Sequence, residues 1–588
     1  MVPEILPLLL RSCSKTHKLQ YRTSLHGLAI KAGLQSVFFC NHILNMYAKC
    51  GNLNLAHQLF EEMPERNLVT WSALVSGYDQ ADKPLMALGL FKKMRTELEP
   101  NEFCFASALS SCARLMALRH GQQCHSDSLK LGYSSVSFVY NSLIKMYSKC
   151  GQCDDAISVF HSASGVTLVS YNAIITGLVE NKQPEIGYEM FKTMRRQGLV
   201  PDHFTFMGLL GTCIDSLDFW ILAQLHCQTI KLMLDSMTII GNVLITTYKK
   251  FKLIEEAQKV FNLIGEKDVI SWNTMIAACS HCDDHVRALG LFREMEKESS
   301  QRPDDFTYAS LLSASAGLAS IRHGKQIHAL LIRTRSQADV GIGNALLNMY
   351  SKCGSIKHAC AVFEQMSCHN LLSLNAMIAG FAYHGLGEKA IEMFGFMKDM
   401  GIKPDSVTFI GLLIACSHVG LVDEGQAIFD SMYSIYEIPS NIEHFSCLID
   451  LLGRAGRFGD ADKYVKKFHF GDDPVVLGCL LSACRLHGNV ITGERLAKRI
   501  LDLEPVTTSP YVLLSNLYAS DGMWGGVAQA RKLLKDSGLK KEPGHSLIDV
   551  EGFVKKFTIA DFSHPRMEEI LDILKILSWT GDEELDCY

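Results

Sequence analysis

A phrase of about 23 residues occurs four times in this chain, and its spacing constrains the fold more than any other feature. The copies span residues 41–63, 141–163, 242–264 and 344–366. Successive copies start 100, 101 and 102 residues apart. In the last copy, apolar residues recur at helical spacing on both sides of Gly354, which predicts two amphipathic helices with a glycine ending the first. Neither helix could bury its apolar stripe alone, so the sequence predicts a solenoid of stacked helix pairs.

Composition narrows the class of protein further. Apolar residues make up 48% of the 588, which is enough for a continuous core and argues against disorder. The net charge of −5 has the wrong sign for a protein that binds duplex DNA through a broad basic face. It does not exclude single-stranded RNA bound base by base in a groove. No apolar run reaches the roughly 18 residues that a membrane span needs.

The twenty cysteines follow the repeats rather than a disulfide pattern. One repeat position holds Cys50, Cys150 and Cys353, and another holds Cys13, Cys112, Cys213 and Cys416. A cysteine that recurs at one position of many units is best explained as a small buried hydrophobic residue, which favours a reducing compartment. Two CxxC spacings, 150–153 and 279–282, lie too far apart along a solenoid to share one metal ion.

Two further kinds of unit lie between the copies of the phrase. One opens with a short run such as WSALVSGY at 71–78 and ends in Pro-Asp or Pro-Asn. The other opens with FxF or FTY and carries a histidine in its second half, at His125, His226 and His328. These recurring histidines are better explained by packing than by catalysis. Units of about 35, 35 and 31 residues add up to the observed period of about 101.

These motifs resemble those of the plant pentatricopeptide repeat (PPR) family, in its P-L-S class, whose members act in RNA editing. The resemblance covers nearly the whole chain and implies an all-α, right-handed superhelical solenoid of fourteen repeats over residues 3–473. The L-type units would be 3–36, 102–136, 203–237 and 305–339. The S-type units would be 37–67, 137–167, 238–268 and 340–370, and the P-type units 68–101, 168–202, 269–304 and 371–405. Variant L and S units would follow at 406–441 and 442–473.

The C-terminal part resembles two further segments of the family. Residues 474–550 look like its E motifs, two degenerate helical repeats, and residues 551–588 look like its E+ extension. A zinc deaminase needs His-x-Glu and Pro-Cys-x-x-Cys, and neither occurs in this sequence. We therefore expect no catalytic residues, no cofactor and no metal. The resemblance implies that a DYW-type deaminase or another editing factor would be recruited in trans.

The resemblance assigns base selection to the fifth and the last residue of each repeat, whose side chains would hydrogen-bond to one RNA base. The pairs are Asn41/Asn67 (C or U), Ser72/Asn101 (A), Asn141/Thr167 (a pyrimidine), Asn172/Asp202, Asn242/Asp268 and Asn273/Asp304 (U), Asn344/Asn370 (C or U), Asn375/Asp405 (U) and Ser446/Asp473 (G). From the second repeat onward, these pairs predict the target Y-A-n-Y-U-n-U-U-n-Y-U-n-G, read 5′ to 3′.

Two other sets of residues complete this prediction. The L-type units carry apolar residues at the fifth position, which cannot hydrogen-bond a base edge and leave those slots loosely read. They are Pro7, Ala106, Met207, Ala309 and Ile410. Apolar second residues would pack on base faces. They are Phe38, Val69, Phe138, Val169, Ile239 and Ile270. The competing explanation is that asparagine is common at helix N-caps whatever its function.

Three functions remain open at this point. The first is an RNA reader that marks cytidines of organellar transcripts for C-to-U editing. The second is the same reader acting in splicing, stability or translation, which the E-type ending disfavours. The third is a protein-binding scaffold of tetratricopeptide type, which the mixed period and the Asn–Asp pairs disfavour. No acidic residue lies between Glu4 and Glu61, which we interpret as a basic surface rather than a transit peptide. A mitochondrion, or alternatively a chloroplast, is the expected location.

Overall fold

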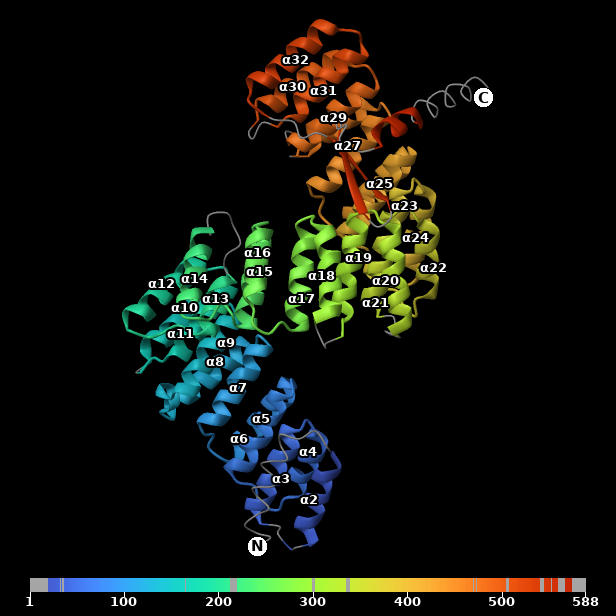
Figure 1. Ribbon diagram of the computed structural model, residues 1–588. Coiled ribbons are helices and arrows are strands. Elements are labelled where there is room, and N and C mark those ends of the chain that lie inside the picture. Colours follow the sequence, from blue (N-terminus) through green and yellow to red (C-terminus); the bar gives the residue numbers. More distant parts are fainter. Residues whose placement is uncertain are drawn as a thin grey trace. The chain divides into compact units, whose positions relative to one another are not determined.

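A computed structural model of the chain describes its helical repeats and a C-terminal hairpin. The described residues are 19–31, 33, 36–163, 165–211, 219–298, 302–334, 339–468, 470–471, 473–503, 507–539, 544–550, 553–558 and 566–573. Most of the first predicted unit, with Pro7, and the end of the tail lie outside them. The chain divides into two compact units, residues 1–266 and 267–588. Each unit is a stack of helix-turn-helix pairs (Figure 1).

Unit 1 alternates first and second helices of successive repeats. The first helices are α3 (Val37–Lys49), α5 (Leu68–Gln80), α7 (Glu102–Arg114), α9 (Ser137–Lys149), α11 (Leu168–Glu180), α13 (His203–Leu210) and α15 (Thr238–Lys250). The second helices are α2 (Leu19–Lys31), α4 (Leu53–Glu62), α6 (Pro84–Glu97), α8 (Leu118–Lys130), α10 (Cys153–Ser162), α12 (Pro184–Arg196), α14 (Phe219–Lys231) and α16 (Ile254–Leu263). A short 3-10 turn, Tyr133–Ser135, follows α8.

Unit 2 continues the same alternation and adds a small sheet. The first helices are α17 (Val269–His281), α19 (Asp305–Gly317), α21 (Val340–Lys352), α23 (Leu371–Tyr383), α25 (Ser406–Val419), α27 (Ile442–Arg454), α29 (Pro474–Leu486) and α31 (Ser509–Ser520). The second helices are α18 (His285–Glu298), α20 (Ile321–Thr334), α22 (Ile356–Gln365), α24 (Gly387–Asp399), α26 (Val422–Ser434), α28 (Phe458–Lys467), α30 (Val490–Leu501) and α32 (Trp524–Asp536). The strands are β1 (His545–Val550) and β2 (Phe553–Thr558).

The turn between the two helices of an S-type repeat depends on a left-handed residue. Gly51, Gly151 and Gly354 have φ of 77°, 76° and 79°, where glycine avoids the Cβ clash of other residues. This confirms the helix end that the sequence predicts at Gly354. In the looser copy of the phrase, Lys252 takes the same place with φ of 56°. Its repeat therefore folds with the same turn in spite of an unfavourable residue.

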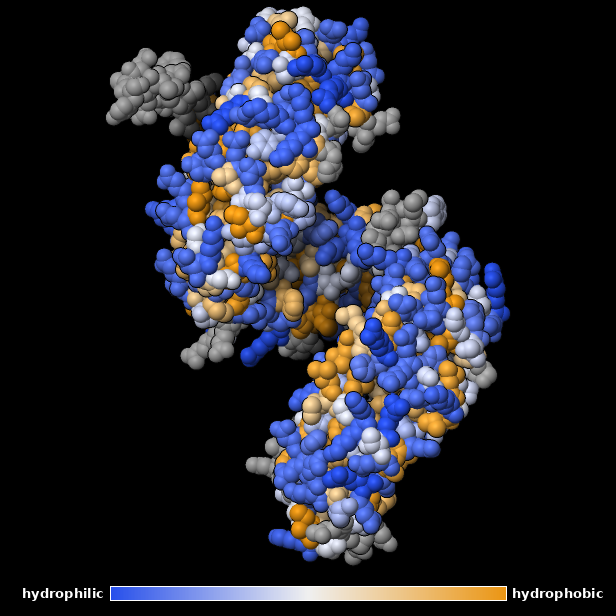
Figure 2. Space-filling view, turned by 180° about the vertical axis from the view of Figure 1, so that it is seen from behind, coloured by the Kyte–Doolittle hydropathy of each residue, from blue (hydrophilic) through white to orange (hydrophobic). Residues whose placement is uncertain are grey.

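The core of each unit forms where the first helices of neighbouring repeats pack together. Fully buried Phe105, Leu109 and Ile144 belong to it in unit 1. Close approach also requires glycine in two L-type second helices. A Cβ on Gly121 would lie 2.3 Å from Met146 Sδ, and one on Gly324 would lie 2.2 Å from Met349 Sδ. The surface outside this core is largely hydrophilic, with scattered hydrophobic patches (Figure 2).

The recurring histidines of the L-type repeats join one repeat to the next. The Nδ1 atoms of His125, His226 and His328 lie 2.9, 2.7 and 2.8 Å from the hydroxyls of Tyr147, Tyr248 and Tyr350. The rings also meet edge to face. Burial lowers the pKa of each imidazole, and it raises the pKa of Tyr248 to about 12. These histidines therefore hold the solenoid together as neutral packing residues.

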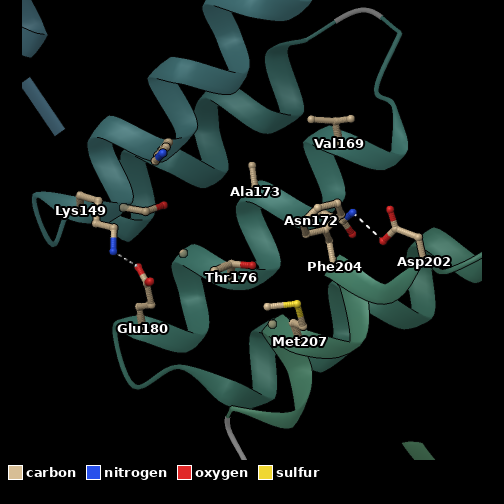
Figure 3. Close-up of a pocket in the computed structure, with 13 residues that line it drawn as sticks. Lys149, Val169, Asn172, Ala173, Thr176, Glu180, Asp202, Phe204 and Met207 are labelled. Carbon is tan, nitrogen blue, oxygen red and sulfur yellow. Dashed lines mark hydrogen bonds and ion pairs between the residues drawn. The ribbon is translucent and has the colours of Figure 1, made fainter. Parts of the chain in front are cut away.

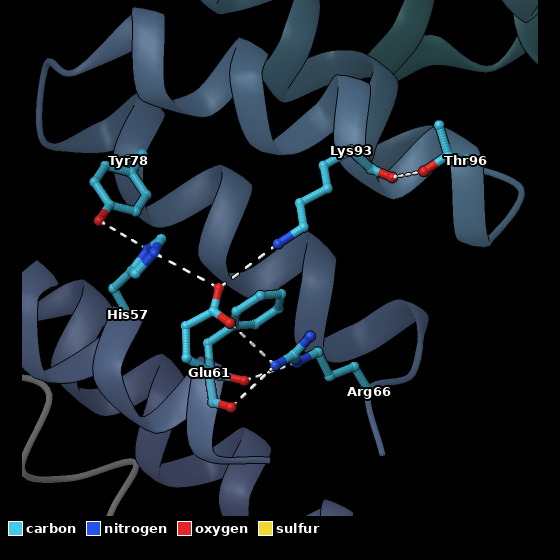
Figure 4. A network of polar contacts seen from close by, with 7 residues as sticks. His57, Glu61, Arg66, Tyr78, Lys93 and Thr96 are labelled. Atoms are coloured by element: carbon cyan, nitrogen blue, oxygen red, sulfur yellow. Dashed lines mark hydrogen bonds and ion pairs between the residues drawn. The ribbon is translucent and has the colours of Figure 1, made fainter. Parts of the chain in front are cut away.

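A polar network around Glu61 joins α4 to α5 and α6 (Figure 4). The carboxylate of Glu61 lies 3.3 Å from the Arg66 guanidinium and 3.8 Å from the Lys93 ammonium. Arg66 also donates to the carbonyl of Phe60 at 2.8 Å and stacks over its ring. These contacts hold the short loop that connects α4 to α5. The residue after Arg66 is Asn67, one of the predicted base-selecting residues.

None of the described cysteines forms a disulfide, and they differ in burial. Cys112 and Cys416 are fully buried in the core, as the recurrence of their position predicts. Cys50, Cys150 and Cys353 are only half-buried, because they follow the last residue of a first helix at the turn. The expectation of a buried hydrophobic position is therefore wrong for this second set.

The hairpin is the one described element outside the helical pattern that the sequence did not predict. Strands β1 and β2 pair antiparallel, with Val550 opposite Phe553. Residues 545–550 belong to the segment that the sequence assigned to degenerate helical repeats. Only two residues separate the strands, a connection typical of a β-hairpin, but the strands are too short for alternation to identify them.

Candidate nucleic-acid interface

Many of the first helices expose an apolar side chain at their second residue. Phe38, Val69, Phe138, Val169, Ile239 and Ile270 are between 48% and 62% exposed. The L-type units do the same with aromatic residues, Phe103, Phe204 and Phe306. Exposed apolar side chains at one position of successive repeats form a row of flat surfaces, and such surfaces are suited to stacking with bases.

The structure brings five of the nine predicted base-selecting pairs into direct contact. In each pair, Nδ2 of the fifth-residue asparagine donates to Oδ1 of the last residue. The distances are 3.1 Å for Asn41/Asn67, 2.9 Å for Asn172/Asp202, 2.8 Å for Asn273/Asp304, 3.3 Å for Asn344/Asn370 and 3.0 Å for Asn375/Asp405. The two side chains come from residues about 30 positions apart, so repeat stacking creates the contact.

A third side chain, which the sequence analysis missed, completes these five pairs. It is the hydroxyl at the third residue of the following repeat, and it donates to Oδ1 of the fifth-residue asparagine. The donors are Thr70, Thr205, Thr307, Ser373 and Thr408, at 2.7, 2.6, 2.6, 2.6 and 2.7 Å. A Ser or Thr three residues after an Asn or Asp is also a helix-start pattern, which is the signal that could have found it.

The last residue of each pair is the N-cap of the next first helix. Asp202 Oδ1 accepts from the backbone N–H of Thr205 at 2.9 Å, and the Thr205 hydroxyl accepts from the backbone N–H of Asp202 at 3.2 Å. The N-cap explanation raised by the sequence therefore applies to the last residues. It does not apply to the fifth residues, because Asn172 lies inside α11 and its amide bonds only side chains.

The aspartates of these pairs remain ionised. Burial by itself would raise the pKa of Asp202, but hydrogen bonds from the Thr205 backbone, the Thr205 hydroxyl and the Asn172 amide outweigh it and lower the pKa. The same balance lowers the pKa of Asp304 and Asp405. All of these bonds end on Oδ1. Within the described residues, Oδ2 of Asp202 therefore has no hydrogen-bond partner and can accept from a ligand.

Three of the other four predicted pairs, Ser72/Asn101, Asn141/Thr167 and Ser446/Asp473, are not joined by a hydrogen bond among the described residues. The hydroxyls of Ser72 and Ser446 turn back to carbonyls of their own helices, at 3.2 and 2.9 Å. The Oδ1 atom of Asn141 is buried without a partner. Asn101 and Asp473 cap helices, and Thr167 contacts the Ser170 hydroxyl at 3.1 Å. Asn242 and Asp268 belong to different units, so their pairing stays a sequence prediction.

One of the five pairs lines a cavity of about 740 Å³ between α9, α11 and α13 (Figure 3). Val169 and Phe204, the second residues of two successive repeats, lie on its wall with Asn172 and Asp202. The fifth residue of the next L-type unit, Met207, adds a further apolar surface. The cavity thus combines apolar walls with a polar edge.

Lysines supply the positive charge of this cavity. Lys145 and Lys149 of α9 line it, and the Lys149 ammonium lies 2.7 Å from a carboxylate oxygen of Glu180. Both groups of that ion pair are nearly half exposed, so it contributes roughly 0–1 kcal/mol and can exchange partners readily. A phosphate of a bound strand can therefore compete for the Lys149 ammonium.

The described part of the chain lacks two features, a candidate metal site and a helix that could span a membrane. No group of three or more His, Cys, Asp or Glu side chains there is placed to hold a metal ion. No helix there is long and apolar enough to cross a bilayer.

Comparison with known sequences identifies the family. Profiles described as "PPR repeat family" and "PPR repeat" match residues 166–215, 267–317 and 369–418, and residues 38–68, 69–97, 138–163 and 344–371. A pentatricopeptide repeat-containing protein of Arabidopsis thaliana is 34% identical over 586 residues, covering 99% of this chain and 83% of the relative. The chain belongs to the PPR family. The family assignment confirms the resemblance seen in the sequence. A further profile, described as "E motif", matches residues 487–549 of this PPR protein.

Other relatives and solved structures agree with this assignment. A second Arabidopsis thaliana PPR protein, named as chloroplastic, is 34% identical and covers 97% of this chain and 70% of its own length. The crystal structure of the maize PPR protein PPR10 aligns with a TM-score of 0.55 at 17% identity, over 91% of this chain and 84% of that one. The same protein in complex with an 18-nucleotide psaJ RNA element aligns with a TM-score of 0.53 over 86% and 80%. The family and fold are those of a non-enzymatic repeat protein.

Proposed function

We propose that this PPR protein binds single-stranded RNA in a sequence-specific manner and recognises sites for C-to-U editing of organellar transcripts. The observation that carries the proposal is the set of five joined pairs, each with unused hydrogen-bonding groups. In the Asn172/Asp202 pair, one amide N–H and one carboxylate oxygen remain available after all internal bonds are made. A base edge that offers an acceptor next to a donor satisfies both groups.

The surroundings of the pair support a base rather than another ligand. A base in the cavity would lie between Val169 and Phe204, with its edge toward the amide and the carboxylate (Figure 3). Its phosphate would be within reach of the lysines of α9. A net charge of −5 is compatible with this arrangement, because the positive charge is needed only locally along the strand.

The editing role rests on the C-terminal segment. The matched E motif covers α30 to α32 and most of strand β1, and the resemblance associates such segments with editing factors. None of the 588 residues forms the zinc-binding motif of a deaminase. We therefore propose that the deaminase, of DYW type or another editing factor, is contributed from outside these residues and acts on a cytidine near the bound strand. One relative is named as chloroplastic, which supports a plastid as the alternative to a mitochondrion.

A gel-shift titration tests the RNA-binding part of the proposal. The purified chain is titrated with the RNA Y-A-n-Y-U-n-U-U-n-Y-U-n-G, and with a control of the same composition in shuffled order at the same salt concentration. Tighter binding of the ordered RNA supports base-by-base recognition. Equal, weak binding of both RNAs contradicts the proposed register and favours the protein-binding scaffold.

Editing is tested separately from binding. Organellar RNA from plants that lack the protein is compared with RNA from wild-type plants at cytidines downstream of matching sequences. Loss of C-to-U conversion at such a site supports the editing role. Unchanged conversion together with altered splicing or transcript abundance supports the alternative in which the same RNA reader acts in those processes.

A further inference from the structure

The hydroxyl that completes the five joined pairs belongs to the next repeat rather than to the repeat that reads the base. Thr205, for example, is the third residue of the repeat after Asn172. Thr205 is fully buried, so its hydroxyl cannot itself contact RNA. The hydroxyl instead lies between the side-chain amide of Asn172 and the N-cap residue Asp202, where it can orient the amide.

Two contacts fix the orientation of the Asn172 amide. The carboxylate of Asp202 can only accept, so the amide must present Nδ2 to it, at 2.9 Å. The Thr205 hydroxyl accepts from the backbone N–H of Asp202 and donates to Asn172 Oδ1 at 2.6 Å. With one bond alone, the amide plane could rotate about that bond. With both bonds, the direction of the remaining N–H is fixed.

The hydroxyl proton has a choice of acceptors, and the distances favour the amide. In all five pairs the hydroxyl lies 2.6–2.7 Å from the asparagine Oδ1 and 2.9–3.0 Å from the Oδ1 of the last residue. The first set is Thr70, Thr205, Thr307, Ser373 and Thr408 with their asparagines. The second set is the same hydroxyls with Asn67, Asp202, Asp304, Asn370 and Asp405. The same geometry thus recurs in both units.

One repeat lacks this arrangement and provides a contrast within the chain. The corresponding hydroxyl for Asn141 is that of Ser170, which donates to the Tyr140 hydroxyl at 3.4 Å and lies 3.1 Å from Thr167 Oγ1. The Oδ1 atom of Asn141 is then left buried without a partner. A hydroxyl at the third position is therefore insufficient by itself. It must reach the amide.

We propose that, where it reaches the fifth-residue asparagine of the preceding repeat, the third-residue hydroxyl is a positioning residue that sets the base preference of that preceding repeat through the orientation of the asparagine amide. The inference rests on the proposed function, because it concerns the same base-reading pairs. It makes base selection a property of two neighbouring repeats. Base selection should be strong at the repeats of five asparagines, which are Asn41, Asn172, Asn273, Asn344 and Asn375. It should be weaker at the repeat of Asn141.

The test uses Thr205→Val, which keeps the shape of the side chain and removes its hydroxyl. Four RNAs that differ only at the fifth nucleotide of the predicted target, the one opposite Asn172, compete for the full-length protein. We expect the wild type to prefer U. Without the hydroxyl, Oδ1 of Asn172 is free to accept from the amino group of cytosine, so the ratio of the Kd values for C and U should fall at least fivefold. Thr205→Ser restores a hydroxyl and should restore the ratio.

Controls separate positioning from stability. Ser170→Ala removes a hydroxyl from the same kind of helix start without touching Asn172, and should lower the unfolding temperature without changing the preference at the fifth nucleotide. Thr408→Val repeats the experiment at the eleventh nucleotide, opposite Asn375, if Thr205→Val does not fold. If Thr205→Val binds all four RNAs more weakly but keeps the wild-type ratio of the Kd values for C and U, the inference is overturned and the proposed function is not. A wild type without preference at that nucleotide would overturn the proposed base reading, and the inference with it.

Discussion

The change Asp202→Asn isolates the charge and hydrogen-bonding pattern of a single base-reading pair. Asparagine is as good an N-cap as aspartate, so the bond from the Thr205 backbone N–H should keep Oδ1 in place. The Asn172 amide can still donate to that oxygen. The Asn344/Asn370 pair of another repeat already has this composition and geometry, with 3.3 Å between the two side chains. We therefore expect the fold to be retained.

What changes is the atom that faces the ligand. The free Oδ2 acceptor of Asp202 becomes an amino group that can only donate. Against uracil, this donor opposes the N3–H group, whereas against cytosine it meets the N3 acceptor. An unmatched polar group in a desolvated site costs about 1–3 kcal/mol. Because about 1.4 kcal/mol is a tenfold change, the preference for U over C at the fifth nucleotide should fall by roughly 5- to 150-fold.

Fluorescence anisotropy with two labelled RNAs that differ by U or C at that nucleotide measures this ratio directly. The reciprocal change Asn370→Asp should shift the tenth nucleotide, opposite Asn344, toward U. Thermal unfolding controls for the loss of the carboxylate at the helix N-terminus, which should cost about 0.3–1 kcal/mol. If both variants keep the wild-type ratio within twofold and bind each RNA as tightly as the wild type does, the assignment of these pairs to base edges is refuted.

Three further predictions concern stacking, the turn and pH. Phe204→Ala should weaken binding of both RNAs by about 1–3 kcal/mol in anisotropy titrations without changing the U-to-C ratio, because stacking does not read the base edge; a changed ratio would contradict this. Lys252→Gly should raise the free energy of unfolding by about 0.5–1 kcal/mol in denaturant titrations, because φ of 56° disfavours lysine; destabilisation would contradict the strain. Burial lowers the pKa of His226 and His328 in the folded protein. As pH falls, these histidines are therefore protonated in the unfolded chain before they are protonated in the folded one. Their stabilisation is complete above the usual pKa of 6.5 and is lost as pH falls, so the unfolding temperature should drop between pH 7.5 and 5.5, and less so in His226→Gln.

Much of the fold follows from local sequence. A phrase repeated about every hundred residues, with apolar residues at helical spacing and a glycine at the turn, determines helix pairs and their order. The first helices α3, α5, α9 and α11 begin at residues 37, 68, 137 and 168, where the pattern places the starts of units. Such features are predictable because helix periodicity, capping and turns depend on residues only a few positions apart.

The hairpin and the partly exposed cysteines were not predictable in the same way. Strands of six residues show too little alternation to be distinguished from loops, and they form only because β1 finds β2 across a two-residue connection. Cys150 and Cys353 lie at a turn where the side chain is only partly buried. Burial at a turn depends on how the next repeat covers it, which the local pattern does not encode.

In the candidate site, too, some features follow from local sequence and others only from packing between repeats. The sequence by itself determined which residues stand at the fifth and last positions, since these follow from counting within each repeat. Only the tertiary structure decided which pairs meet, because Asn172 and Asp202 lie 30 residues apart and touch through stacking of successive helices. It also brought in the Thr205 hydroxyl and left Asn141 Oδ1 without a partner. The physical reason is that hydrogen-bond geometry acts over a few tenths of an ångström, a precision set by packing between repeats rather than by the residues within one.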